Sequence, residues 1–98
     1  MNKNKTVTLQ STVLQNKNIL SSNIDDEAIL LCIRNSKYYG MNPIGSDIWN
    51  LLQEPIRIDE LIKQLKEKYT VDDNRCAKDV IEFITMLAKK ELVEIIIE

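Results

Sequence analysis

Residues 28–52 read AILLCIRNSKYYGMNPIGSDIWNLL. The unbroken apolar run at 28–33 has the length of a strand and predicts a central strand buried on both faces. Asn35 and Ser36 form a turn signal, because Asn tolerates a left-handed backbone, and residues 37–41 then return as a second strand. The stretch therefore begins with a predicted β-hairpin.

A helix is expected to follow the hairpin directly. Asn42 can cap free N–H groups, and Pro43 suits the first helical position because its missing donor would be unpaired there anyway. Apolar residues recur behind them at helical spacing, and Pro55 ends the pattern. We therefore predict a helix of about ten residues.

Two more helices are predicted further along the chain. Residues 58–69 carry apolar side chains at three- and four-residue steps, and Asp59 and Glu60 favour the positive end of a helix dipole. Asp72 can cap a third helix that ends near Lys89 and Lys90. Its apolar face is wider than one core contact requires and comprises Cys76, Ala77, Val80, Phe83, Ile84, Leu87 and Ala88. Residues 93–97 predict a short closing strand or a tail packed on the sheet.

The polar segment before the hairpin gives a weaker pattern. Val7 and Leu9 alternate with polar residues, which predicts a short strand at 6–9 followed by a long irregular connection. Two or three strands followed by three short helices indicate an α+β fold. A length of 98 residues favours one domain spanning residues 1–98.

Composition argues against several classes of function. Thirteen Lys and Arg against fifteen Asp and Glu leave a net charge of −2, so non-specific nucleic-acid binding is disfavoured. The absence of histidine removes the commonest general base and metal ligand. Neither Ser46 nor Cys76 lies in a recognisable nucleophile motif. We expect no enzymatic activity and no cofactor or metal.

Cysteine usage and hydropathy indicate a cytoplasmic location. Cys32 and Cys76 lie in apolar surroundings without a CxxC unit, so two buried thiols in a reducing compartment are expected. Residues 1–5 are polar and basic, but no apolar stretch of signal-peptide length follows them. No run approaches the roughly 20 apolar residues that span a bilayer, so no membrane partner is expected.

The second strand of the hairpin is a candidate docking edge. A strand that ends a sheet exposes unpaired N–H and C=O groups, which an extended peptide can satisfy by joining as another strand. Tyr38 and Tyr39 suit a peptide-binding surface, and Gly40 permits close approach of a second backbone. The pattern fits equally well an arrangement in which a tyrosine belongs to the core and Gly40 only forms a bend.

DNA binding is the alternative from another class. Three short helices beside a hairpin are also the layout of a winged helix, as in transcriptional regulators. The outward positions of the third helix mix acids and bases evenly, which suits phosphates poorly. A small catalytic subunit is the third possibility.

The chain resembles the PqqD-like proteins, which are precursor-peptide recognition elements for ribosomally made peptides. Residues 38–52 are similar to the signature Y-x-L-N-x-T-G-A-x-I-W-x-L-L, with Asn42, Gly45 and Trp49 in register. The resemblance continues through 58–69 and an ending similar to D-V-x-x-F-L-x-x-L-x-x-x-G-L-V, so it covers about residues 28–93.

Several positions depart from the family pattern. Met41 stands where Leu is usual, and Ile44 and Ser46 stand where Thr and Ala are common. Arg57 occupies a helix cap often held by Thr, and Glu91 replaces a Gly that often ends the last helix. These departures affect the expected helix boundaries more than the function.

The resemblance implies a winged-helix-like α+β domain without catalytic activity, in which an N-terminal three-stranded antiparallel sheet precedes three helices. The leader segment of a precursor peptide would add antiparallel to the third strand, in a groove between this strand and the third helix. The strand residues carried over by position are Lys37, Tyr38, Tyr39, Gly40 and Met41. The candidates for the helical wall are Arg75, Cys76, Asp79, Val80, Phe83 and Leu87.

Stand-alone members of this length resemble the B1 proteins of lasso-peptide clusters. Those proteins hold the leader, often through a Tyr-x-x-Pro motif, for a separate leader peptidase and a macrocyclase. Others resemble PqqD itself, which presents its peptide to a radical enzyme. The polar start and the acidic turn at 25–27 are more similar to the lasso group. We therefore predict an adaptor that delivers a leader peptide to the two lasso-pathway enzymes.

Overall fold

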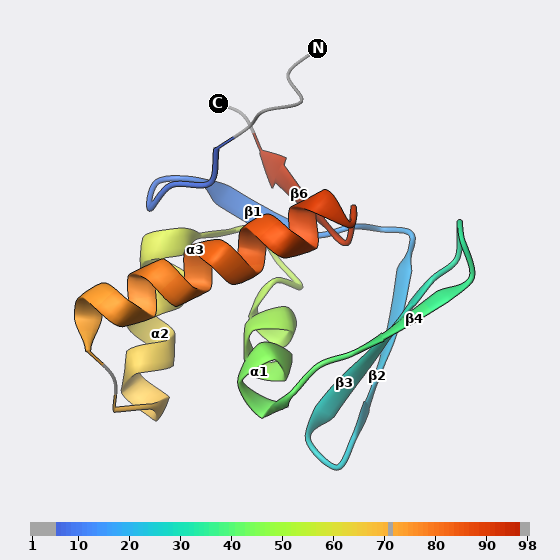
Figure 1. The fold of residues 1–98 in the computed structure, drawn as a ribbon, viewed down its shortest axis with the longest axis horizontal. Coiled ribbons are helices and arrows are strands. Elements are labelled where there is room, and N and C mark those ends of the chain that lie inside the picture. Colours follow the sequence, from blue (N-terminus) through green and yellow to red (C-terminus); the bar gives the residue numbers. More distant parts are fainter. Residues whose placement is uncertain (1–5, 71, 97–98) are drawn as a thin grey trace.

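The computed structural model describes residues 6–70 and 72–96, so the predictions for residues 1–5 and 97 lie outside the described part. Within this part the chain forms two three-stranded antiparallel sheets and three helices (Figure 1). The elements are β1 (Thr12–Gln15), β2 (Ile19–Ile24), β3 (Glu27–Cys32), β4 (Lys37–Gly40), α1 (Pro43–Leu51), β5 (Ile56–Arg57), α2 (Ile58–Lys68), α3 (Asp73–Lys89) and β6 (Val93–Ile96). The α+β class is confirmed, and so is a three-stranded sheet, β2–β3–β4, that precedes the three helices.

The predicted hairpin is β3 and β4, and β2 joins it on the far side of β3. Asp25 and Asp26, with φ of 52° and 67°, make the tight turn between β2 and β3, as a type I′ turn requires. In the turn between β3 and β4 the left-handed residue is Ser36, with φ of 58°. Asn35 supports this turn by accepting a 3.0 Å hydrogen bond from the N–H of Lys37.

Burial on both faces of the central strand was expected, and this prediction is wrong. Ala28, Leu30 and Cys32 are buried on the face of β3 that meets the core. Ile29, between them, is 37% exposed, and Ile33, just past the strand, is 55% exposed. The difference arises because none of the described elements covers the outer face of this small sheet, so the strand alternates as an antiparallel strand with one solvent-exposed face does.

The second sheet has the order β5–β1–β6 and joins the two ends of the chain. The closing strand predicted at 93–97 is confirmed as β6, which pairs with β1 rather than with the hairpin sheet. The strand predicted at 6–9 is wrong. Thr8 and Ser11 instead form a turn: the N–H of Thr8 donates to Ser11 Oγ at 2.9 Å, and the N–H of Ser11 donates to Thr8 O at 3.1 Å.

The strands β1 and β2 lie where an irregular connection was predicted. Of the six residues of β2, ILSSNI, only Ile19 is buried, so the segment carries almost no hydrophobic pattern. Pairing with β3 along its whole length forms the strand instead.

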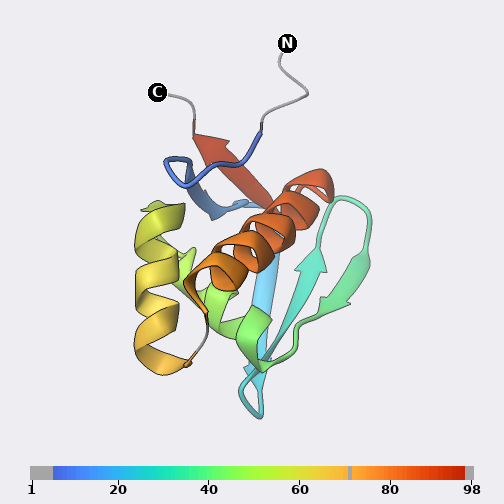
Figure 2. The same cartoon turned by 60° about the vertical axis from the view of Figure 1, so that its left-hand side comes forward.

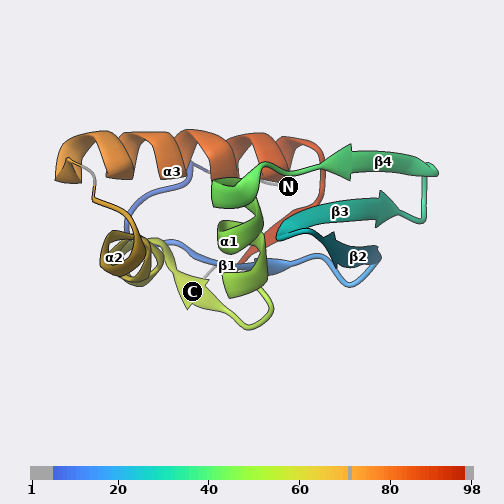
Figure 3. The same cartoon turned by 90° about the horizontal axis from the view of Figure 1, so that it is seen from below.

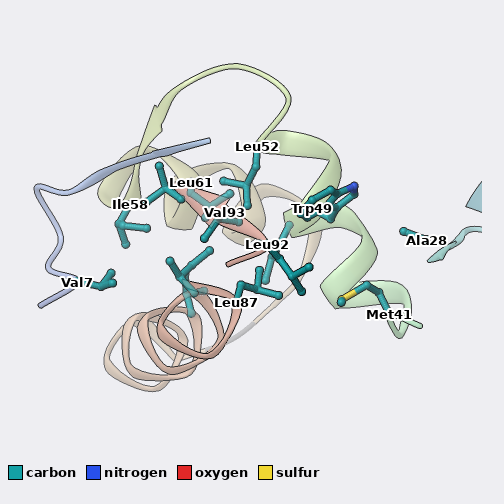
Figure 4. Close-up of a cluster of buried hydrophobic side chains, with 14 of the residues drawn as sticks. Val7, Ala28, Met41, Trp49, Leu52, Ile58, Leu61, Leu87, Leu92 and Val93 are labelled. Atoms are coloured by element: carbon teal, nitrogen blue, oxygen red, sulfur yellow. The ribbon is translucent and has the colours of Figure 1, made fainter. Parts of the chain in front are cut away.

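The core lies where the three helices meet the two sheets. The helix α3 packs against α2 and β6, while α1 packs against β3. Figure 2 shows α3 running diagonally between α2 and the hairpin sheet. Trp49, Leu52, Leu87 and Leu92 are fully buried in one apolar cluster (Figure 4).

Cys32 and Cys76 are both buried and are not joined in a disulfide, as predicted. Among the described residues, no helix is both long enough and apolar enough to cross a membrane.

The start of α1 connects the helix to the hairpin. Asn42 caps α1 as predicted, because its Oδ1 accepts a 2.7 Å hydrogen bond from the N–H of Gly45. The buried hydroxyl of Ser46 accepts a 2.6 Å hydrogen bond from the N–H of Ala28 and donates to the carbonyl of Met41 at 3.3 Å. One side chain of α1 therefore bridges the ends of β3 and β4.

Two departures from the family pattern have a visible structural outcome. Arg57 precedes α2 without a side-chain cap and instead pairs with Asp59, with 2.7 Å between Nη2 and Oδ2. Glu91 takes the left-handed conformation after α3, with φ of 61°, and the N–H of Leu92 donates to Leu87 O at 2.9 Å. The helix therefore ends in the usual way although the residue there is not Gly.

Replacing Ser46 with Ala tests the bridge between α1 and the hairpin. We expect the free energy of unfolding to fall by about 1 to 3 kcal/mol, because the buried N–H of Ala28 loses its acceptor. Urea denaturation followed by the fluorescence of Trp49 measures the change. Ser22→Ala, on the exposed part of β2, is the control and should change stability by less than about 0.5 kcal/mol. Equal effects of the two substitutions would contradict a structural role for the Ser46 hydroxyl.

Candidate functional site

The strand β4 is the edge of its sheet, so within residues 6–70 and 72–96 one side of its backbone has no neighbouring strand. The N–H of Met41 donates to Ala28 O at 2.9 Å, which fixes the alternation of the antiparallel ladder. Tyr39, opposite Leu30, therefore turns its N–H and C=O toward β3. The backbone groups of Tyr38 and Gly40 point the other way, out of the sheet.

The two tyrosines lie on opposite faces of this edge. Tyr39 faces the core side, where its ring is half-buried and Lys90 Nζ lies 5.6 Å from the ring centroid. Tyr38 is 71% exposed on the outer face. The sequence left open whether a tyrosine of this strand belongs to the core. In the structure Tyr39 packs partly against the core, and Tyr38 is a surface residue. A Cβ on Gly40 would meet no atom within 4 Å, so no described residue packs on Gly40 at the outer face of the sheet.

A largely apolar cavity of about 290 Å³ continues from the end of β4, and we call it the helix pocket. It lies between the start of α1, the end of α2 and the first turns of α3, and Figure 3 shows β4 leading into α1 at the level of α3. Its lining residues are Asn42, Ile44, Gly45, Ile48, Leu65, Tyr69, Cys76, Asp79, Val80 and Phe83. The pocket therefore begins two residues beyond the free edge.

Four of the six residues predicted for the helical wall line the helix pocket: Cys76, Asp79, Val80 and Phe83. Cys76 and Val80 are mostly buried, whereas Phe83 is half-buried and Asp79 is exposed. These four residues recur at steps of three and four positions along α3, so they lie on one face of the helix, and this face lines the cavity.

The other predicted site residues lie elsewhere. Arg75 points to solvent and lies near Asp79, with 3.8 Å between Nε and Oδ2. Leu87 is fully buried in the core (Figure 4), and Met41 is buried at the end of the hairpin. Lys37 is exposed at the start of β4.

Gly45 explains how closely α3 approaches α1. A Cβ at this position would lie 3.2 Å from Phe83 Cζ and 3.0 Å from Asn42 Oδ1, which is tighter than ordinary van der Waals contact. The missing side chain therefore allows the Phe83 ring to rest against the first turn of α1, where it forms one wall of the helix pocket.

A polar cluster supports the opposite wall. Tyr69 donates its hydroxyl proton to Asp47 Oδ2, and Lys68 Nζ lies 3.0 Å from the same oxygen. The hydrogen bond from Tyr69, and then the contacts of Lys68, hold the pKa of Asp47 below its ordinary value of 3.8. The same hydrogen bond raises the pKa of Tyr69 above its ordinary value. The cluster fixes the Tyr69 ring at the pocket.

The sequence pattern does not reveal the α1 and α2 side of the helix pocket. It places four lining residues on amphipathic helices and indicates no role in a site for them: Ile44, Ile48, Leu65 and Tyr69. The signal that the sequence offers is Ile44, an apolar residue in the first helical turn. In the structure this residue is 48% exposed. Within residues 6–70 and 72–96, no three His, Cys, Asp or Glu side chains gather closely enough to hold a metal ion.

Comparisons with known proteins agree with this geometry. Residues 27–93 match the family model described as coenzyme PQQ synthesis protein D (PqqD). A solved structure described as TbiB1 in complex with the TbiA(beta) leader peptide is 36% identical and superposes with a TM-score of 0.78. The match covers 83% of this chain and 94% of that one. No curated protein matches the chain.

Asp47→Asn tests the polar cluster behind the helix pocket. Because the folded-state pKa of Asp47 is lowered, its charge stabilises the fold fully above the ordinary value of 3.8 and progressively less as the pH falls through the folded-state value. We expect the variant to unfold about 4 °C below the wild type at pH 7, and the gap to close in acid. Thermal unfolding at several pH values between about 2 and 7 measures this.

Glu82→Gln is the control, because it removes a charge from the exposed side of α3 that forms no ion pair with the described residues. Glu82→Gln should show no such difference in unfolding temperature from the wild type. If the difference in unfolding temperature between wild type and Asp47→Asn stayed constant down to the lowest pH, the charge of Asp47 would not be what stabilises the fold.

Proposed function

The chain belongs to the PqqD family, and from this premise we propose that it is a non-catalytic adaptor that binds the leader segment of a ribosomally made precursor peptide. The observation that carries the proposal is the free edge of β4 beside the helix pocket. Support comes from TbiB1, a similar protein solved in complex with a leader peptide.

The peptide joins the sheet as an extended strand, antiparallel to β4. Its backbone bonds to the outward N–H and C=O groups of Tyr38 and Gly40, which pair with no other strand in the described part of the chain. Alternate side chains of the added strand turn toward α3, because successive side chains of a strand point to opposite faces. The part of the peptide that extends past Gly40 reaches the helix pocket, where Phe83 and Val80 receive an apolar side chain.

The adaptor role includes delivery. With the leader held at β4, the remainder of the precursor is free to enter a leader peptidase and a macrocyclase, most simply those of a lasso-peptide pathway. We place this step in the cytoplasm, where thiols such as Cys32 and Cys76 stay reduced. The proposal treats the whole chain as one binding domain.

A peptide selection tests the function and does not require the sequence of the precursor. A displayed library of random 16-residue peptides is selected on the purified protein, and the best peptide is titrated at several salt concentrations. We expect micromolar or tighter binding with a small salt dependence. Duplex DNA is titrated in parallel, since a DNA-binding regulator would bind it and weaken steeply as salt rises. Failure to enrich any peptide would overturn the proposal.

Tyr38→Pro tests strand addition at the free edge. Proline removes the outward N–H of residue 38, and an edge strand tolerates it because no bond to β3 is lost. We expect the selected peptide to bind about tenfold more weakly, since one of its carbonyls loses a donor. Tyr38→Ala is the matched control, because it removes the same ring and keeps the N–H, and should change affinity less than about twofold.

Isothermal titration calorimetry gives the affinities, and circular dichroism checks the fold. Equal affinities of the two folded Tyr38 variants would show that β4 is not the docking edge.

Ile44→Asp tests the helix pocket. The residue is 48% exposed, and an acid in the first turn of α1 suits the helix dipole, so the fold should survive. A charge at the pocket wall should weaken binding of the selected peptide at least about tenfold, because the apolar side chain of the peptide must displace the water that hydrates the new carboxylate. Ile24→Asp, 55% exposed at the end of β2, is the control and should leave affinity within about twofold. Equal losses would exclude the pocket from the binding site.

A further inference from the structure

Two lysines lie at the end of β4 that is distant from the helix pocket. Lys37 is opposite Cys32 in the sheet register, so its side chain leaves β4 on the same face as Tyr39. Lys90, the C-cap of α3, places Nζ 5.6 Å from the Tyr39 ring centroid. Lys90 also lines a small surface cavity with Cys32 and Asn35, beside the turn that precedes β4. Lys37 and Lys90 therefore flank the same end of the strand.

Neither lysine has a carboxylate partner among the described residues. Glu91, the acid among the residues that line this cavity, pairs with Arg34, with 3.1 Å between Nη1 and Oε1. Asp79 lies at the opposite end of α3, at the helix pocket. The surface along β4 is thus apolar toward α1 and positively charged toward the turn.

The register of an added strand determines which peptide residue meets these charges. Consider a peptide strand that pairs antiparallel with β4 and bonds to Tyr38 and Gly40. One residue of the peptide then lies opposite Tyr39. The residue two positions closer to the C-terminus of the peptide lies opposite Lys37. Both side chains point to the α3 side. Directly opposed residues have Cβ atoms about 4.5 to 5.5 Å apart, close enough for a charge pair.

We propose that the peptide recognised by this protein carries Asp or Glu two residues downstream of the residue that packs on Tyr39, and that Lys37 and Lys90 hold this carboxylate. The inference rests on the proposed function. It restricts the peptides that the protein binds from any extended leader to a leader with an acidic residue at this defined position. The two lysines set specificity, while the edge and the helix pocket supply most of the affinity.

The same peptide selection tests the inference. Peptides enriched on the wild-type protein should be rich in Asp or Glu at one fixed position, two residues after an apolar or aromatic one. For the best peptide, changing this acid to its amide should weaken binding about threefold to tenfold. The double variant Lys37→Met, Lys90→Met keeps the aliphatic part of both side chains and removes both positive charges. It should therefore bind the acidic peptide and its amide variant with equal affinity.

A control double variant, Lys63→Met, Lys78→Met, makes the same change in net charge on α2 and on α3, away from the pocket and from β4. It should keep the full difference between acid and amide. The inference is overturned if no acidic position is enriched, or if the acid-to-amide change costs the same affinity on the wild type and on the Lys37, Lys90 variant. If no peptide is enriched at all, peptide binding itself fails and the inference falls with it.

Discussion

The peptide groups of Tyr38 and Gly40 point out of the hairpin sheet, and no strand of the described chain lies beside them. Every functional role proposed for the chain depends on that free edge. An exposed sheet edge is a liability for aggregation, and proteins usually keep such strands short or charged. Here β4 spans only four residues, Lys37–Gly40, and begins with a lysine. A short edge limits pairing with random partners and favours a peptide that also fits the helix pocket.

The first turn of α1 holds the edge and the pocket together. Asn42 caps the helix, Gly45 admits the Phe83 ring, and the Ser46 hydroxyl bridges Ala28 and Met41. The residues that end β4 are therefore the residues that start the pocket. This compact junction gives a physical reason why an Asn and a small residue occur three positions apart in the sequence.

The sequence predicted the parts of the molecule that local chemistry specifies. The hairpin, the capped start of α1 and the wide face of α3 have strong patterns, and the structure confirms these elements. The strands β1 and β2 were missed because their residues are mostly polar and pairing with other strands forms them. Half of the helix pocket was missed because Leu65 and Tyr69 meet α3 only in the folded chain, and no spacing in the sequence shows this.

Amide hydrogen exchange followed by NMR tests the central claim most directly. In the free protein the N–H of Tyr39 should exchange slowly, because it is bonded to β3, while those of Tyr38 and Gly40 exchange fast. Addition of a peptide selected on the wild-type protein should slow Tyr38 and Gly40 by at least about tenfold and leave Tyr39 nearly unchanged. Fast exchange at Tyr38 and Gly40 in the saturated complex would contradict strand addition at β4.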